Sequence, residues 1–348
     1  MNRFFRRKLA LVLAALLLLP ILAGCQGTTA PKTTQSTEPS GPPDRSSFKL
    51  EPDPTQSPEE QEVIKILSIG NSHSQDSAWL LAEVLRAEMP DQKFVVAELY
   101  FPGAMTEHLA NAYKDEPVYD YQLNTDGTWN TTEGSTIAYG LRGQRWDVIV
   151  INESSRHIGL ENVVKQNLIQ QFIDYIHTQI NYDPYLMYNW TWAQPTDQTF
   201  YGPDFDPQPP ASFWNTFTGH YGASRVTHYN MMRDLVVKYV EPNPEFDLVL
   251  YSATPVQYAT EVLGVPQTDL YRDYTHLSDY GRLYSAYMWY GQLFNLDSIS
   301  AVNLDKVSVN LRTRRFVQFG DLELTQEMKD NIVKSVNYAL QNPLQMPE

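Results

Sequence analysis

The stretch Ile64–Ser77, IKILSIGNSHSQDS, decides the fold. Its first half is a short apolar run rich in β-branched residues, Gly70 and Asn71 follow as turn formers, and a helical pattern begins at about Asp76. This order predicts a buried strand, a tight turn and the start of a helix. Ser72 then lies at the carboxyl end of the strand, where backbone N–H groups and the helix dipole can stabilise an oxyanion, so it is a candidate nucleophile. The alternative is that Asn71 or Ser72 only caps the helix.

Apolar segments separated by helical patterns recur along the chain and predict an α/β fold. Five of them are typical of strands, at residues 64–69, 94–100, 146–151, 185–190 and 246–251. Strands that alternate with helices form a parallel sheet covered on both faces, and its ligands bind at the carboxyl ends of the strands. The residues that follow these ends include Ser72, Gly103, Asn152, Asn189 and Trp190. A further segment, Val307–Leu311, alternates like a short edge strand.

Composition divides the chain into three parts. Residues 1–25 form a signal, and residues 26–61 are rich in Thr, Ser, Pro, Gly and Glu, which predicts a flexible tether. Residues 62–348 form one folded domain with two insertions. The first, 114–145, contains a polar hairpin expected to lie outside the main sheet, and the second, 191–222, is an irregular segment rich in aromatic residues and proline.

The first 25 residues have the pattern of an export signal. A basic segment, Arg3–Lys8, precedes the apolar stretch Leu9–Ile21, which is shorter than a typical membrane-spanning helix. The segment Leu22–Cys25 follows, with small residues and a cysteine at its end. This resembles a bacterial lipoprotein signal with its lipobox. The resemblance implies that Cys25 becomes the lipidated first residue of a protein anchored on the outer side of the cell membrane. An ordinary secretory signal with a chance cysteine is the alternative.

The charge and cysteine content exclude several kinds of site. The chain has 41 acidic and 26 basic residues, a net charge of −15, and loss of residues 1–24 removes four basic residues and makes it −19. Since no basic stripe is present, nucleic-acid binding is not expected. Cys25 is the only cysteine, so the mature domain has no disulfide, thiol nucleophile or cysteine-based metal site.

One of the seven histidines has the surroundings of a catalytic base. His276 follows Asp273 by three residues on a loop after the last predicted strand. In an Asp-x-x-His turn the carboxylate can hold one imidazole nitrogen while the other faces a serine, although the pattern alone is common. His73 adjoins the candidate nucleophile and could contact the substrate, but we expect a surface histidine with its own hydrogen bonds. His157, His220 and His228 have no ligand-like spacing, so we assign them no metal, and we expect no cofactor.

In combination these pieces resemble the SGNH (GDSL-type) hydrolases over roughly residues 63–295. The residues on which this resemblance depends are Gly70-Asn71-Ser72, Gly103, Asn152 and Asp273-x-x-His276, together with His276-Leu277-Ser278 followed by Gly281-Arg282. The resemblance implies a three-layer α/β/α, flavodoxin-like fold with a five-stranded parallel sheet. It also implies that Ser72 is the nucleophile, His276 the general base and Asp273 its orienting acid. The oxyanion hole would comprise the N–H groups of Ser72 and Gly103 and the side-chain amide of Asn152.

Two motifs depart from the pattern of that family. The first reads Gly-Asn-Ser in place of Gly-Asp-Ser, which leaves the serine intact. The third, usually Gly-x-Asn-Asp, is replaced by Ile151–Ser155, INESS. Asn152 fits by position and chemistry, but Ser154 could supply the third oxyanion donor instead.

The resemblance to the SGNH hydrolases and the predicted lipoprotein signal together predict a serine esterase at the cell surface. Trp190, Trp192 and Trp214 belong to an aromatic-rich segment whose flat rings suit sugars, which favours removal of acyl groups, above all acetyl, from a carbohydrate. A small satellite core is the alternative interpretation of these rings. Two other functions stay open, a non-catalytic glycan-binding lipoprotein on the same fold and a lipase or phospholipase.

Overall fold

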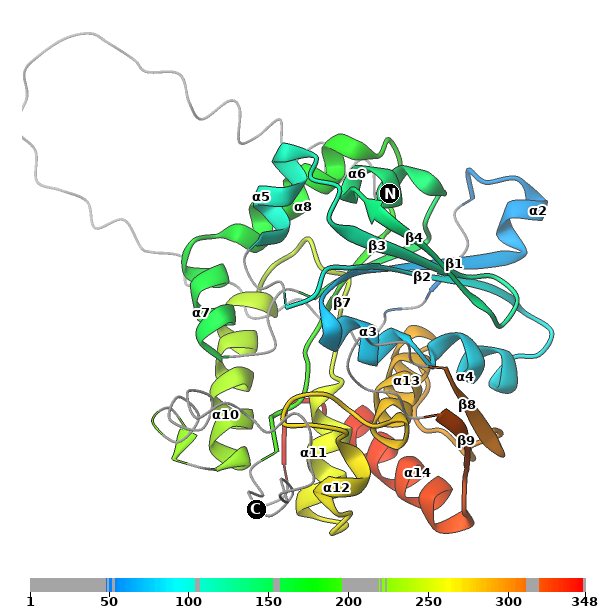
Figure 1. Ribbon diagram of the computed structural model, residues 1–348, viewed down its shortest axis with the longest axis vertical. Helices are drawn as coiled ribbons and strands as arrows, with labels where there is room; N and C mark the ends of the chain where they lie inside the picture. Colours follow the sequence, from blue (N-terminus) through cyan, green and yellow to red (C-terminus); the bar gives the residue numbers. More distant parts are fainter. Residues whose placement is uncertain are drawn as a thin grey trace, which may run out of the picture.

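A seven-stranded mixed sheet flanked by helices forms the centre of the molecule (Figure 1). The computed structural model describes residues 48, 50–51, 54–103, 107–152, 157–195, 219, 221–222, 224–310 and 319–346. The strands of the main sheet are β1 (Val63–Gly70), β2 (Lys93–Tyr100), β3 (Tyr119–Asn124), β4 (Trp129–Ser135), β5 (Val148–Ile151), β6 (Tyr185–Asn189) and β7 (Leu248–Leu250). Their order is β4-β3-β2-β1-β5-β6-β7.

The five predicted strands form the parallel part of this sheet. β2, β1, β5, β6 and β7 are neighbours in that order and all run in the same direction. Counting only these five, the order is 2-1-3-4-5, which is the flavodoxin-like arrangement of a doubly wound sheet. The carboxyl ends of β1, β2 and β5 therefore meet at one edge of the sheet.

The helices cover both faces of the sheet. They are α2 (Pro58–Gln61), α3 (Ser72–Ala78), α4 (Leu81–Glu88), α5 (Glu107–Lys114), α6 (Ile137–Gly143), α7 (His157–Lys165), α8 (Leu168–Gln179), α10 (Arg225–Leu235), the π-helical turn η2 (Val236–Val240), α11 (Ala253–Glu261), α12 (Gln267–Leu270), α13 (Asp279–Leu293) and α14 (Gln326–Gln341). Alternate residues of β5 divide the core: Val150 packs in one cluster with Trp289 of α13, and Ile149 in another with Phe172 of α8. This alternation gives the three layers.

The segment 114–145 corrects the prediction of a hairpin outside the main sheet. It contains β3, β4 and α6, and β3 pairs antiparallel with β2 from Val96 opposite Asn124 to Tyr100 opposite Asp120. The sheet thus has seven strands and is mixed, not five-stranded and parallel. The segment looked peripheral because some of its buried residues are polar, and Asn124, which is fully buried, accepts a hydrogen bond from Arg86 of α4 at 2.6 Å.

Three other boundaries differ from the predictions. The helix after β1 begins at Ser72, not near Asp76. The predicted edge strand at 307–311 is β8 (Lys306–Asn310), which pairs with β9 (Phe319–Glu323) in a separate two-stranded sheet. The domain also begins before residue 62, because Phe48 packs edge-on against Tyr185 and is buried in the core.

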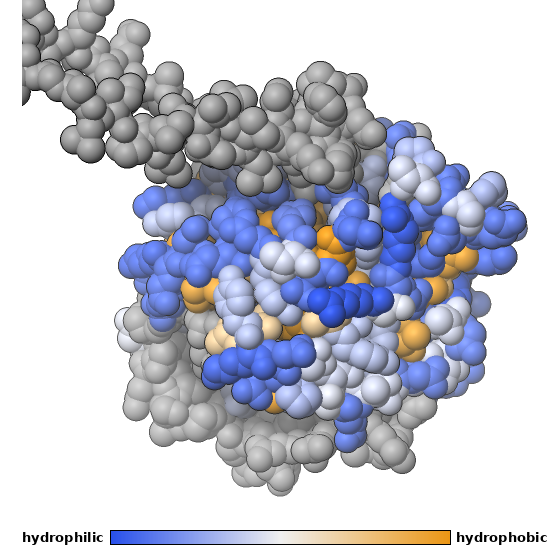
Figure 2. All heavy atoms as spheres, turned by 90° about the horizontal axis from the view of Figure 1, so that it is seen from above, coloured by the Kyte–Doolittle hydropathy of each residue, from blue (hydrophilic) through white to orange (hydrophobic). Residues whose placement is uncertain are grey.

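The surface is largely polar on the face drawn in Figure 2, with hydrophobic residues scattered among hydrophilic ones. Within the described ranges no helix combines the length and the apolar character needed to cross a membrane. The predicted signal, Cys25 and most of the predicted tether lie outside the described residues.

Candidate active site

The turn between β1 and α3 presents Ser72 at the carboxyl edge of the sheet. Asn71 is the N-cap of α3, and its side-chain oxygen accepts the N–H of His73 at 2.9 Å. Ser72 is the first helical residue, so the capping alternative holds for Asn71 and leaves the Ser72 hydroxyl available. Gly70 is required by close packing, since a Cβ there would lie 2.8 Å from the Asn152 carbonyl oxygen and would overlap the Ser74 side chain.

Ser72, His276 and Asp273 form a continuous hydrogen-bonded chain. The Ser72 Oγ atom lies 2.7 Å from His276 Nε2, and His276 Nδ1 lies 2.7 Å from Asp273 Oδ2. The second carboxylate oxygen, Oδ1, accepts the backbone N–H groups of Thr275 at 2.8 Å and His276 at 2.7 Å. The carboxylate therefore fixes both the imidazole ring and the backbone that carries it, which is the arrangement of a serine nucleophile with an oriented base.

The environment of Asp273 keeps it ionised. Its burial opposes the charged form, but the charge of His276, the hydrogen bonds from that residue and the charge of Arg272 outweigh this effect and lower the pKa of Asp273. Asp273 is 1% exposed, whereas the His276 side chain is 22% exposed. An ionised, shielded acid behind a more accessible imidazole suits general-base chemistry at neutral pH.

The three predicted oxyanion donors lie at the ends of adjacent strands. The Ser72 N–H is at the start of α3, Gly103 follows β2, and Asn152 follows β5, the strands on either side of β1. Gly103 is exposed with φ of +71°, a conformation that favours glycine. Asn152 is fully buried, and its Nδ2 donates to the Asn189 carbonyl at 3.1 Å, which leaves its second N–H for another acceptor. The alternative donor, Ser154, lies outside the described residues.

A family model, the domain of unknown function DUF4886, matches residues 65–315. The chain belongs to the DUF4886 family. Its structure is similar to the crystal structure of a DUF4886 family protein from Bacteroides uniformis ATCC 8492, with a TM-score of 0.61, 23% identity, and coverage of 82% of this chain and 98% of that one. This likeness shows the fold.

The chain was also compared with a second solved structure and with curated proteins. A protein from Slackia heliotrinireducens that is described as a candidate SGNH hydrolase has a TM-score of 0.41 and 16% identity, over 66% of this chain and 99% of that one. No curated protein matches the chain.

His73 of this DUF4886 domain is buried beside His276, which corrects the prediction of a surface histidine. It is 4% exposed, and its Nε2 lies 3.0 Å from the Thr275 hydroxyl. Its ring stacks on Trp192 with a centroid distance of 5.1 Å and lies 5.3 Å from the His276 ring. The His276 imidazole therefore lies against the His73 ring, which in turn stacks on Trp192.

The tryptophans predicted to bind substrate are part of the interior. Trp190 and Trp192 are 1% and 0% exposed, so neither offers a free face to a sugar. Trp190 packs against Tyr229, and the Trp192 indole N–H donates to the Thr275 carbonyl at 2.9 Å. Their burial follows from their position at and just after the end of β6, a central strand of the DUF4886 sheet. Trp214 lies outside the described residues.

Helix α3 is a polar helix buried on all sides, and sequence reasoning missed its role. Each side chain from His73 to Ser77 bonds to a different part of the fold: His73 to Thr275, Ser74 to Glu98, Gln75 to Gln122, Asp76 to Arg272 and Arg282, and Ser77 to Asn189. The available signal was a run of polar residues directly after a buried strand, with no apolar face. Such a helix is held by specific hydrogen bonds and not by hydrophobic packing.

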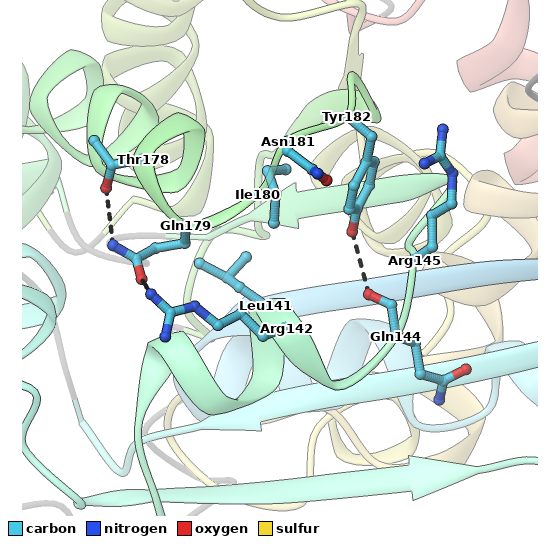
Figure 3. Close-up of a pocket in the computed structure, with 9 residues that line it drawn as sticks. All are labelled: Leu141, Arg142, Gln144, Arg145, Thr178, Gln179, Ile180, Asn181 and Tyr182. Carbon is cyan, nitrogen blue, oxygen red and sulfur yellow. Dashed lines mark hydrogen bonds between the residues drawn. The ribbon is translucent and has the colours of Figure 1, made fainter. Parts of the chain in front are cut away.

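A hollow of about 520 Å³ lies at the opposite end of the sheet. It is formed by the ends of α6 and α8 and the segments that lead into β5 and β6 (Figure 3). There Arg142 donates to Gln179 at 2.7 Å, and the Tyr182 hydroxyl donates to the Gln144 carbonyl at 3.3 Å. The hollow opens at the amino ends of these strands and is separate from the candidate active site. Across the described ranges no cluster of His, Cys, Asp or Glu is arranged to hold a metal ion.

Proposed function

We propose that the protein is a serine ester hydrolase in which Ser72 is the nucleophile, His276 the general base and acid, and Asp273 the orienting acid. The observation that supports this most directly is the chain of two 2.7 Å hydrogen bonds from the Ser72 hydroxyl through the imidazole to a buried carboxylate. The three residues come from two segments some 200 positions apart, and each has the bond that its role requires.

The proposed reaction is acyl transfer to water. Ser72 Oγ attacks the ester carbonyl while His276 Nε2 takes its proton, and the same proton then passes to the departing alkoxide, which leaves as the alcohol. A water molecule attacks the acyl-serine, gives a proton to His276, and the acid is released as Ser72 regains its hydrogen. The Ser72 and Gly103 N–H groups and the amide of Asn152 would stabilise the oxyanion in both steps.

The proposed substrate is an acyl group, such as acetyl, on a carbohydrate outside the cell. Its support is the lipoprotein signal that ends at Cys25, which would place the domain on the outer side of the membrane. Because Trp190 and Trp192 are buried, they lend no support to sugar binding, and the substrate class depends on the proposed location alone.

Hydrolysis of an aryl acetate by the protein and by Ser72→Ala tests the proposed reaction. We expect Ser72→Ala to lower kcat by at least about a thousandfold, since removal of a triad member abolishes nucleophilic attack. Circular dichroism of both proteins checks that the fold is retained. Equal rates for the two proteins would overturn the proposal and favour a glycan-binding protein without turnover. A panel of acetylated sugars and longer-chain esters then ranks the substrate classes.

A further inference from the structure

A buried carboxylate on α3 joins the helix of the nucleophile to the loop of the base. Asp76 lies one helical turn after Ser72 and is fully buried. Its Oδ2 accepts the Leu277 N–H at 2.9 Å, directly after His276 in the chain, and its Oδ1 accepts from Arg272 Nη1 at 2.8 Å. One side chain on the nucleophile helix therefore contacts the base loop on both sides of the imidazole.

Arg272 extends this contact along the loop. The same Nη1 group that reaches Asp76 also donates to the Leu277 carbonyl, and the Arg272 backbone N–H donates to the His276 carbonyl at 3.0 Å. Asp76 and Arg272 together thus fix the backbone at residues 272, 276 and 277. The Asp-x-x-His turn is closed from within by Asp273 and held from outside by Asp76.

Arg282 connects the same carboxylate to α13. It is fully buried, its Nε and Nη2 atoms donate to Asp76 Oδ1, and its Nη1 donates to Asp279 at 3.0 Å. Two arginines and two aspartates give the cluster no net charge. Burial alone would raise the pKa of Asp76, but the charges of Arg272, Arg282 and His276 hold it well below its usual range. Because the cluster is buried, removal of one member leaves an unpaired buried charge.

The approach of α13 explains the rest of the His-Leu-Ser and Gly-Arg pattern. Ser278 is the N-cap of α13 and accepts the Gly281 N–H at 3.1 Å. A Cβ on Gly281 would overlap the Leu270 carbonyl and lie 3.1 Å from the Leu277 Cβ. The glycine lets α13 come close enough for Arg282 to reach Asp76.

We propose that Asp76 is a positioning residue that sets the distance between the Ser72 hydroxyl and the His276 imidazole by tying α3 to the base loop and to α13. The inference rests on the proposed esterase function. Both carboxylate oxygens of Asp76 accept hydrogen bonds from the base loop and α13, so it acts through Ser72 and His276 and not on the substrate. Loss of the tie leaves both reacting groups in place but loosens their alignment, and a misplacement of about 1 Å can cost on the order of a hundredfold in rate.

The test compares Asp76→Asn with Asp147→Asn in the full chain. Asp147 is the matched control, because its carboxylate also accepts a backbone N–H, that of Lys65 at 2.8 Å, but lies at the amino end of β5, far along the sheet from Ser72. With an aryl acetate we expect Asp76→Asn to lower kcat by about ten- to a hundredfold with KM within about twofold. Asp147→Asn should lose thermal stability but keep its kcat.

A fluorophosphonate that labels Ser72 gives a readout independent of turnover. We expect Asp76→Asn to be labelled more slowly than the wild type, with half-saturation at the same probe concentration. Asp147→Asn should be labelled at the wild-type rate. A wild-type kcat and labelling rate in Asp76→Asn, or an equal loss in both variants, would overturn the positioning role. If Ser72→Ala hydrolyses the ester as fast as the wild type, the esterase proposal itself fails, which is a different result.

If Asp76→Asn does not fold, Arg272→Lys is used to test the same proposal. It keeps a positive charge beside Asp76 but loses the guanidinium that reaches both Asp76 and the Leu277 carbonyl. We expect a loss of kcat of about tenfold at unchanged KM, and a wild-type kcat would contradict the proposal.

Discussion

Gly70 fixes where the backbone that carries Ser72 lies. The chain passes so close to the end of β5 that a methyl group at residue 70 would meet the Asn152 carbonyl at 2.8 Å as well as the Ser74 side chain. A backbone carbonyl cannot rotate away as a flexible side chain can. The turn that carries Ser72 is therefore placed by the absence of a side chain one residue before its cap.

Gly70→Ala should displace this turn. We expect destabilisation of about 1–3 kcal/mol from overpacking and a loss of kcat of more than about a hundredfold. Gly264→Ala is the control, since φ there is +69° but a Cβ meets nothing within 4 Å, so it should cost about 1 kcal/mol through backbone strain and leave kcat unchanged. Urea unfolding and aryl acetate hydrolysis measure both effects. Full activity of Gly70→Ala would show that the turn can relax.

Sequence reasoning at the residue scale depended on whether a side chain has a chemical signature. Ser72, Asp273 and His276 could be proposed as partners because their types and order fit one reaction, and the structure brings the three side chains into contact. The prediction that Trp190 and Trp192 bind a sugar was wrong, because both are buried. An aromatic ring suits sugar binding and core packing equally well, and only its burial distinguishes these two roles.

At the scale of elements, α3 is attached to the sheet through the buried side chain of Glu98. Glu98 of β2 is 1% exposed and lies between Ser68 of β1 and Gln122 of β3, its register partners. The Ser74 hydroxyl contacts both the Asn71 carbonyl, at 2.6 Å, and Glu98 Oε1. The Ser74 hydroxyl therefore joins the first turn of α3 to the buried carboxyl group on β2.

This arrangement gives folding a defined pH dependence. Burial raises the pKa of Glu98 to about 8, although the hydrogen bond from Ser74 acts in the opposite direction. The contribution of Glu98 to stability is complete below the ordinary carboxyl pKa of 4.5 and is lost as the pH rises through about 8, because only the unfolded chain releases the proton easily.

Glu98→Gln should remove this dependence. The amide stays neutral at every pH, so the stability lost between about pH 5 and about pH 9 should be smaller than in the wild type by on the order of a few kcal/mol. Urea unfolding of both proteins across that range measures the difference. Glu83, whose pKa burial raises to about 7, contributes with the same sign in both proteins and cancels in the comparison. Parallel pH profiles would mean that Glu98 does not hold its proton.

The missed elements have two physical causes, burial of polar residues and a proline within a helix. β3 was not assigned to the main sheet because Gln122 and Asn124, which face the interior, are polar, and their partners on α3 and α4 are distant in sequence. Helix α11 was hidden by Pro255, which reads as a helix breaker but lies in the first turn, where a proline is tolerated. Periodicity finds elements that are buried by apolar residues, and here several are buried by hydrogen bonds.

At the scale of the whole molecule, topology explains why the candidate site could be proposed from sequence. Parallel strands end at one edge, so residues that follow β1, β2 and β5 had to lie near one another. The cluster of Asp76, Arg272 and Arg282 could not be inferred in the same way, since a buried ion pair has no sequence period. Arg282 was noted only as part of the Gly-Arg pattern, and Asp76 and Arg272 were visible only as ordinary charged residues.

The location of the molecule is a separate prediction that depends on Cys25. After loss of residues 1–24 the net charge is −19, so an anionic membrane surface would repel the protein and a lipid on Cys25 would have to hold it. Cys25→Ser should abolish labelling by an alkyne fatty acid and shift the protein from the membrane to the soluble fraction. A high-salt wash should leave the wild type on the membrane, because salt screens charge but not burial of an acyl chain. Wild-type protein that is soluble and unlabelled would instead indicate an ordinary secretory signal, and the proposed substrate would then be sought away from the cell surface.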